Sequence, residues 1–61
     1  MIISSAAISE AVNLCTLNNV RFSSVGERCF SLLETSGLLD QIQAEEADEL
    51  FLSLIQSELE D

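Results

Sequence analysis

The residues of this 61-residue chain that are able to do chemistry are two cysteines and eleven carboxylates. Cys29 directly follows Arg28, and a thiol beside a cation can become a nucleophilic thiolate because the positive charge lowers its pKa. Adjacent residues of a helix point about 100° apart, however, so these two side chains are not expected to meet. We therefore predict that Cys15 and Cys29 are small buried residues with free thiols, and keep a single disulfide between them as the alternative.

The carboxylates raise two other kinds of chemistry, metal binding and acid–base hydrolysis. With two cysteines and no histidine, the chain cannot supply the four Cys and His ligands of a zinc site. No Asp-rich loop has the ligand spacing of an EF-hand calcium site. Paired carboxylates hydrolyse glycosides in some enzymes, but a chain this short is not expected to build the necessary cleft. We therefore predict a protein that is not an enzyme and uses no metal and no cofactor.

The charge of the chain is strongly negative and lopsided. The formal net charge is −9, and from Asp40 onward the sequence has eight acidic residues and no basic one. Proteins bind phosphate backbones through Lys and Arg, so neither nucleic acid nor an anionic membrane surface is an expected partner. No apolar run is long enough to span a membrane, and nothing resembles an export signal. We expect a soluble, cytoplasmic protein.

The elements that must position these residues are predicted to be helices. Proline is absent and there are only two glycines, while the good helix formers Ala, Leu, Glu and Gln are frequent. We expect one small all-α domain over residues 1–61, with the last helix the longest. Ser4 or Ser5 is the expected cap of the first helix, and Asn18 and Asn19 are expected to end it. The three predicted helices span about 6–17, 25–35 and 38–59.

Two local motifs frame the second predicted helix. Ser24 and Glu27 have the spacing of a capping box, in which each side chain accepts a hydrogen bond from a free backbone N–H of the first turn. Gly37 is expected to end the helix in the left-handed conformation. Leu38 would then contact Leu33, as in a Schellman motif.

On a helical wheel, the third predicted helix has three faces rather than two. The predicted core arc contains Ala44, Ala47, Leu50, Phe51, Leu54 and Ile55. A continuous acidic face contains Glu45, Glu46, Glu49 and Glu60. An additional apolar edge lies beyond the core arc and is formed by Leu52 and Leu59, flanked by Ile55 and with Asp48 close by. Two neighbouring helices are not expected to need so wide an apolar arc.

We interpret the apolar edge, with Leu52, Ile55, Leu59 and Asp48, as an interface. Single exposed leucines are common and would need no explanation. A pair seven residues apart is more telling in a chain that is too small to be comfortably stable alone. Oligomerisation would supply the missing stability, and the twofold dimer is the commonest closed assembly. We therefore expect the fold to be completed by homodimerisation.

The acidic face has two interpretations, because it either solvates the helix without binding anything or attracts a basic partner. Glu58 and Glu60 lie at the C-terminal end of the helix, where a negative charge is unfavourable to the helix dipole. Nothing in the sequence suggests that they stabilise the monomer. We expect them to serve solubility, a basic partner, or both.

These features together predict a non-enzymatic, accessory or regulatory interaction protein that binds a host or partner protein through the apolar edge. In size, acidity and helix content the chain is similar to the small accessory proteins that bacteriophages and other mobile elements encode, and that likeness implies binding to a host protein. One alternative is an acidic mimic of nucleic acid that inhibits a basic DNA- or RNA-binding protein. Another is a small chaperone or antitoxin that shields a helix of its partner.

Overall fold

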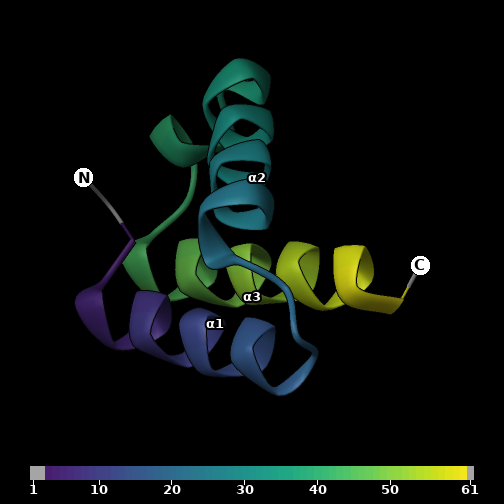
Figure 1. The fold of residues 1–61 in the computed structure, drawn as a ribbon. Coiled ribbons are helices and arrows are strands. Elements are labelled where there is room, and N and C mark those ends of the chain that lie inside the picture. Colours follow the sequence, from purple (N-terminus) through teal and green to yellow (C-terminus); the bar gives the residue numbers. More distant parts are fainter. Residues whose placement is uncertain (1–2, 61) are drawn as a thin grey trace.

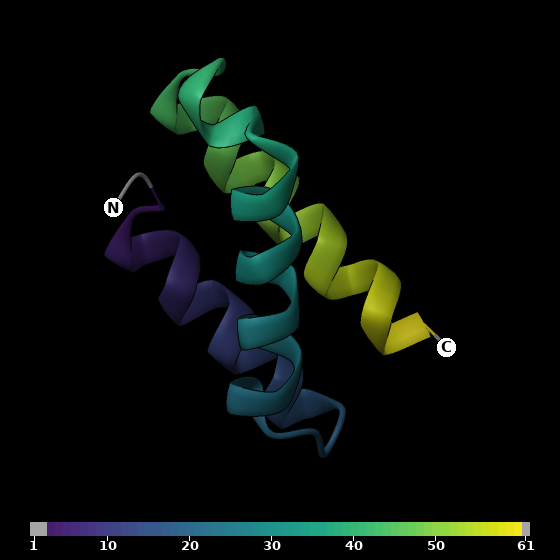
Figure 2. The same ribbon diagram turned by 90° about the horizontal axis from the view of Figure 1, so that it is seen from above.

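Three α-helices and one short 3-10 helix make up residues 3–60, the part of the chain that the structure, a computed structural model, describes. Residues 1, 2 and 61 lie outside that part. α1 and α3 lie side by side and run in the same direction, while α2 runs back across both of them (Figures 1 and 2). The predicted all-α class and the longest last helix are confirmed. The elements are α1 (Ser5–Leu17), α2 (Phe22–Ser36), η1 (Leu38–Asp40) and α3 (Ala44–Glu60).

The hydrophobic core takes residues from all three α-helices. Its fully buried members from α1 are small side chains at a spacing of four residues, and Ala47 is a fully buried small residue of α3. Small residues at a helix contact let two helix axes approach closely, which suits the side-by-side arrangement of α1 and α3. The buried apolar residues are Ile3, Ala7, Ala11, Cys15, Val25, Cys29, Leu33, Ala47, Phe51 and Ile55.

Phe51 is the largest fully buried side chain and lies at the centre of the core. Its ring stacks on the ring of Phe30, with centroids 4.7 Å apart, and meets the ring of Phe22 edge-on at 6.4 Å. Both partners belong to α2, so the aromatic cluster joins α2 to α3. Each such pair adds about 0.5–1.5 kcal/mol beyond the area that it buries.

Both ends of α1 are as predicted. The Oγ of Ser4 caps the helix by accepting a hydrogen bond of 3.2 Å from the backbone N–H of Ala7. At the other end Asn18 is the C-cap and Asn19 has a φ of 59°. Asn is one of the few residues apart from Gly that tolerate this left-handed conformation, so the turn into α2 follows from local chemistry.

The predicted start of the second helix was wrong, because α2 begins at Phe22 and Arg21 is its N-cap, without a side-chain hydrogen bond. The capping box of Ser24 and Glu27 therefore does not form. An N-cap side chain stabilises by about 1 kcal/mol, which is less than the burial of a phenylalanine contributes. The earlier start places Phe22 one turn before Gly26 and against Phe51. Tertiary packing thus outweighs the local cap.

The end of α2 uses a serine hydroxyl to complete its cap. Gly37 has a φ of 73°, as predicted, and its N–H donates to the carbonyl of Glu34 at 3.2 Å. A Schellman motif would also need a direct bond from the N–H of Leu38 to the carbonyl of Leu33. The Oγ of Ser36 accepts from that N–H at 3.3 Å and donates to that carbonyl at 2.9 Å. The hydroxyl therefore bridges the two groups.

The prediction of one unbroken helix over residues 38–59 was wrong. The chain forms η1, then a turn at Gln41 and a bend at Ile42, before α3 begins at Ala44. In a continuous helix Ile42 would project from the polar face. The break instead lets Ile42 pack against the core. Burial of this apolar side chain is thus the physical reason for the interruption.

The close approach of Gly26 and Phe22 yields a testable prediction. A Cβ at position 26 would lie 2.6 Å from the Cζ of Phe22, although Ala in a helix is favoured over Gly by about 1 kcal/mol. We expect Gly26→Ala to lower the free energy of unfolding in the wild-type background. In a Phe22→Ala background the same change should raise it by about 0.5–1 kcal/mol. Thermal and urea unfolding followed by circular dichroism would measure the change in free energy of unfolding in each background. A change of the same sign in both would contradict the close approach of position 26 to the Phe22 ring.

Candidate interaction surface on the third helix

The face of α3 that enters the core is centred on Phe51. Ala47, Phe51 and Ile55 are fully buried, while Leu50 and Leu54 are only half-buried on one side of them. Ile55, which the sequence placed at the interface, is therefore a core residue of the monomer. The buried face of α3 is centred closer to Leu52 and Leu59 than the helical wheel predicted. The predicted apolar edge is therefore one of the two flanks of this buried face.

Leu52 and Leu59, the two leucines of the apolar edge, are half-buried and pack against the core. They lie on the flank of α3 that faces α1. Leu59 lines a hollow together with Leu14 of α1, and Asp48, on the same flank, is bonded to Ser4. The wide apolar arc of α3 has a reason within the monomer, because α1 covers one flank and α2 the other.

Asp48 holds the start of α1 against α3. Its Oδ1 accepts a hydrogen bond from the backbone N–H of Ser4 at 2.9 Å, and its Oδ2 accepts from the Ser4 hydroxyl at 2.7 Å. A carboxylate at a helix N-terminus also interacts favourably with the helix dipole. Ser4 and Asp48 are 44 residues apart. No periodicity or local motif links them, so sequence reasoning missed this contact and assigned Asp48 to the interface.

An open hollow of about 230 Å³ remains between the C-terminal ends of α1 and α3. It is lined by Leu14, Asn18, Gln56, Leu59 and Glu60. Leu17 lies one turn after Leu14 on the same face of α1 and is 81% exposed, the most exposed of the large apolar side chains. We call Leu14, Leu17 and Leu59 the leucine surface.

The predicted acidic face lies on the outside of the molecule. Its members Glu45, Glu46, Glu49 and Glu60 are all exposed. Glu45 and Glu46 fall in the first turn of α3, where the helix dipole favours negative charge. The late start of the helix, at Ala44, places them there.

Within residues 3–60 the one ion pair joins Arg28 of α2 to Glu58 of α3, with 3.1 Å between Nη1 and Oε2. Glu58 thus has a stabilising contact within the monomer that the sequence did not suggest. Its contribution is small, about 0–1 kcal/mol, because the arginine side chain is 61% exposed. None of the four carboxylates of the acidic face takes part in it. Their charge is therefore available to a partner.

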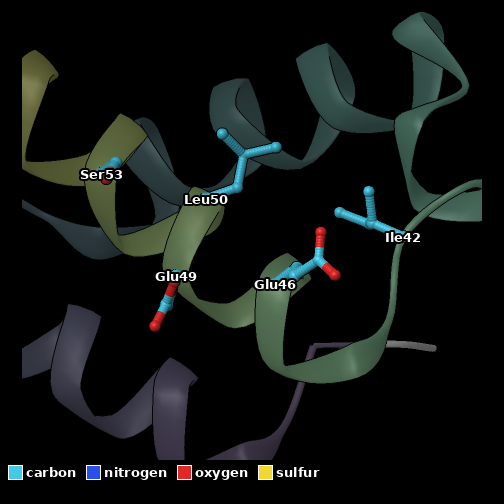
Figure 3. A pocket seen from close by; sticks show the side chains of 5 residues that line it. All are labelled: Ile42, Glu46, Glu49, Leu50 and Ser53. Carbon is cyan, nitrogen blue, oxygen red and sulfur yellow. The ribbon is translucent and has the colours of Figure 1, made fainter.

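A second open hollow, of about 350 Å³, lies where η1 leads into α3. Its lining combines the apolar side chains of Ile42 and Leu50 with Glu46, Glu49 and the hydroxyl of Ser53. Figure 3 shows the Glu46 carboxylate between Ile42 and Leu50, and Glu49 pointing away from them. Two residues of the acidic face thus border an apolar depression. We call this hollow the acidic hollow.

The two cysteines are buried and free, as predicted. Burial raises the pKa of the Cys15 thiol. Burial also raises the pKa of Cys29, and the Glu58 carboxylate raises it further, while the Arg28 guanidinium lowers it by less. Both thiols are therefore protonated at neutral pH and are poor nucleophiles.

The described residues offer little for other chemistry. They contain no group of three or more His, Cys, Asp or Glu side chains that could hold a metal ion. None of the helices in residues 3–60 combines the length and the apolar character needed to cross a membrane. The chain matches no protein-family model, no curated protein and no solved structure. Its function must therefore be inferred from its surfaces.

The contact between Ser4 and Asp48 yields the second prediction. Asp48→Ala removes two hydrogen bonds to a carboxylate and a favourable charge at the start of α1. We expect a loss of about 1–3 kcal/mol in the free energy of unfolding. Glu49→Ala is the control, because it removes an exposed carboxylate of the same helix. It should change the free energy of unfolding by less than about 0.5 kcal/mol.

A double-mutant cycle with Ser4→Ala tests whether the two residues act together. If they do, the double variant should be more stable than the sum of the two single losses predicts, by about 0.5–3 kcal/mol. Strict additivity would show that Asp48 stabilises the fold in some other way.

Proposed function

We propose that the protein is a non-enzymatic interaction protein that binds a partner protein through the apolar edge of α3, at the end where Leu59 opens onto the leucine surface. The observation that carries the proposal is the open hollow to which Leu14 and Leu59 contribute, together with Leu17, which follows Leu14 by one turn on α1 and is 81% exposed. Covering a leucine side chain contributes about 1.5–3 kcal/mol. The open hollow between the ends of α1 and α3 offers a place for an apolar group of the partner.

The state of the reactive side chains supports a binding role rather than catalysis. Both thiols are buried and protonated at neutral pH, and the chain has no histidine to act as a base. Arg28 is engaged with Glu58. A protein of this kind acts by occupying a surface of its partner.

A second candidate function is favoured by the acidic face. Its carboxylates are exposed and form no ion pair within residues 3–60, as expected of a mimic of nucleic acid that inhibits a basic DNA- or RNA-binding protein. Ionic strength separates the two functions, because exposed charges are screened within about 8 Å at physiological salt whereas apolar contacts are not.

Capture of a partner from the lysate of the native cell tests the proposed function. We expect Leu17→Ala to weaken the capture by about tenfold, because a leucine contact of about 1.4 kcal/mol is lost. Leu32→Ala is the matched control, since Leu32 is also exposed, at 52%, but lies on α2. Binding that survives high salt supports the apolar interface. Binding that high salt abolishes, and that Leu17→Ala does not change, would support the mimic instead.

We also propose that, without a partner, two copies associate through the same edge. The melting temperature should then rise with protein concentration, because folding is coupled to assembly. Leu52→Ala combined with Leu59→Ala should remove this dependence. Leu50→Ala combined with Leu54→Ala is the matched control, because these leucines are half-buried on the other flank of α3. This control variant should have a lower free energy of unfolding, but its melting temperature should still rise with protein concentration.

The acidic charge of each copy sets a further condition on self-association. Two chains of net charge −9 repel each other, and salt screens the repulsion. Sedimentation should therefore show stronger association as salt rises. A monomer at every concentration and salt level would overturn the dimer.

A further inference from the structure

The acidic hollow, lined by Ile42, Glu46, Glu49, Leu50 and Ser53, is distinct from the leucine surface. On the helical wheel Glu46, Leu50 and Ser53 lie roughly 100° or more from Leu52 and Leu59, and Ile42 precedes α3. Its volume of about 350 Å³ falls at the lower end of the range of about 300–1,000 Å³ that is typical of ligand sites. A separate occupant is therefore able to bind there.

The apolar part of this hollow is held in place by the fold. Ile42 and Leu50 are half-buried and pack against the core, Ile42 because the helix breaks before Ala44. Their outer surfaces are left facing the depression, with the Glu46 carboxylate between them (Figure 3). An apolar side chain docked there would lie against the surfaces of Ile42 and Leu50.

The charge around the hollow restricts what is able to enter it. Glu46 and Glu49 are exposed, and neither forms an ion pair within residues 3–60. An apolar group docked on Ile42 and Leu50 would displace water from the Glu46 carboxylate beside them, which is unfavourable unless the occupant brings compensating charge. A second copy of this chain, with its net charge of −9, is a poor occupant. A segment with cations on both sides of its apolar residue is a good one.

We propose that the acidic hollow docks a basic segment of a partner protein, in which Lys or Arg residues flank a large apolar side chain. Glu46 and Glu49 are three residues apart, so their side chains leave the helix about 5–6 Å from each other. The apolar side chain packs on the outer surfaces of Ile42 and Leu50. One flanking cation reaches the Glu46 carboxylate beside it, and the other reaches Glu49, which points away from the two apolar residues. This proposal rests on the proposed function and adds a second contact of defined chemistry.

A short synthetic peptide, with lysines on both sides of a leucine pair, tests the proposal with the full chain. Glu46→Gln combined with Glu49→Gln should raise its Kd by about tenfold or more, measured by isothermal titration calorimetry. The matched control is Glu45→Gln combined with Glu60→Gln, which removes the same charge from exposed residues outside the hollow's lining, and it should raise the Kd by less than about threefold. Both pairs are exposed, so folding is preserved.

Two further probes distinguish docking in the acidic hollow from general electrostatic attraction between a basic peptide and the acidic chain. A peptide with serines in place of the leucine pair should bind about tenfold more weakly, and one with glutamates in place of the lysines should not bind. Amide chemical-shift changes on adding the first peptide should centre on Ile42, Leu50 and Ser53. Equal weakening by both pairs of glutamine variants, equal binding of the serine peptide, or shifts centred on Leu14 and Leu59 would each overturn the proposal.

The test is independent of the proposed function at the leucine surface. Leu17→Ala should leave the affinity for the lysine–leucine peptide unchanged, because Leu17 is on α1 and does not line the acidic hollow. If the peptide fails to bind while capture of the partner still depends on Leu17, the acidic hollow is overturned and the proposed function stands. If the peptide binds as described but Leu17→Ala does not affect capture, the proposed function at the leucine surface is overturned and docking at the acidic hollow stands.

Discussion

The burial of Phe51 against α2 is the interaction on which the rest of the structure depends. It is the largest fully buried side chain, and its ring meets Phe30 and Phe22 of α2. To make these contacts, α2 begins at Phe22 and gives up the local cap that Ser24 and Glu27 offer. Gly26 leaves room for the Phe22 ring. In a chain of 61 residues the core is small, so one aromatic cluster outweighs several local preferences.

The position of Phe51 also determines which surfaces of α3 remain for other molecules. With this residue at the centre of the core face, Leu50 and Leu54 lie on one flank, and Leu52 and Leu59 on the other. Neither flank is fully covered, because α1 and α2 each cover only part of a helix that contacts both. Two open hollows result, one beside each flank. One lining combines two leucines with Asn18, Gln56 and Glu60. The other combines Ile42 and Leu50 with Ser53 and two carboxylates, so the second hollow carries more negative charge.

The polar contacts between helices show how so acidic a chain limits its own repulsion. Asp48 is used to cap α1 through Ser4, and Glu58 is paired with Arg28. Glu45 and Glu46 begin α3, where the helix dipole favours them. The other exposed carboxylates of α3, Glu49 and Glu60, lie on the same side of the helix as Glu45 and Glu46. The carboxylates that bond to other helices, Asp48 and Glu58, and those of the exposed acidic face are thus different residues of the same helix.

The sequence by itself determined the helical class, the capping of α1 by Ser4, the turn at Asn19, the left-handed Gly37 and the acidic face of the last helix. These features depend on residues near one another in the chain, where propensity and periodicity act directly. Only the tertiary structure decided the start of α2, the break before Ala44, the half-exposure of Leu50 and Leu54 and the contact of Asp48 with Ser4. Each depends on residues brought together from distant positions, so a helical wheel, which describes one helix in isolation, could not show which helix covers which flank.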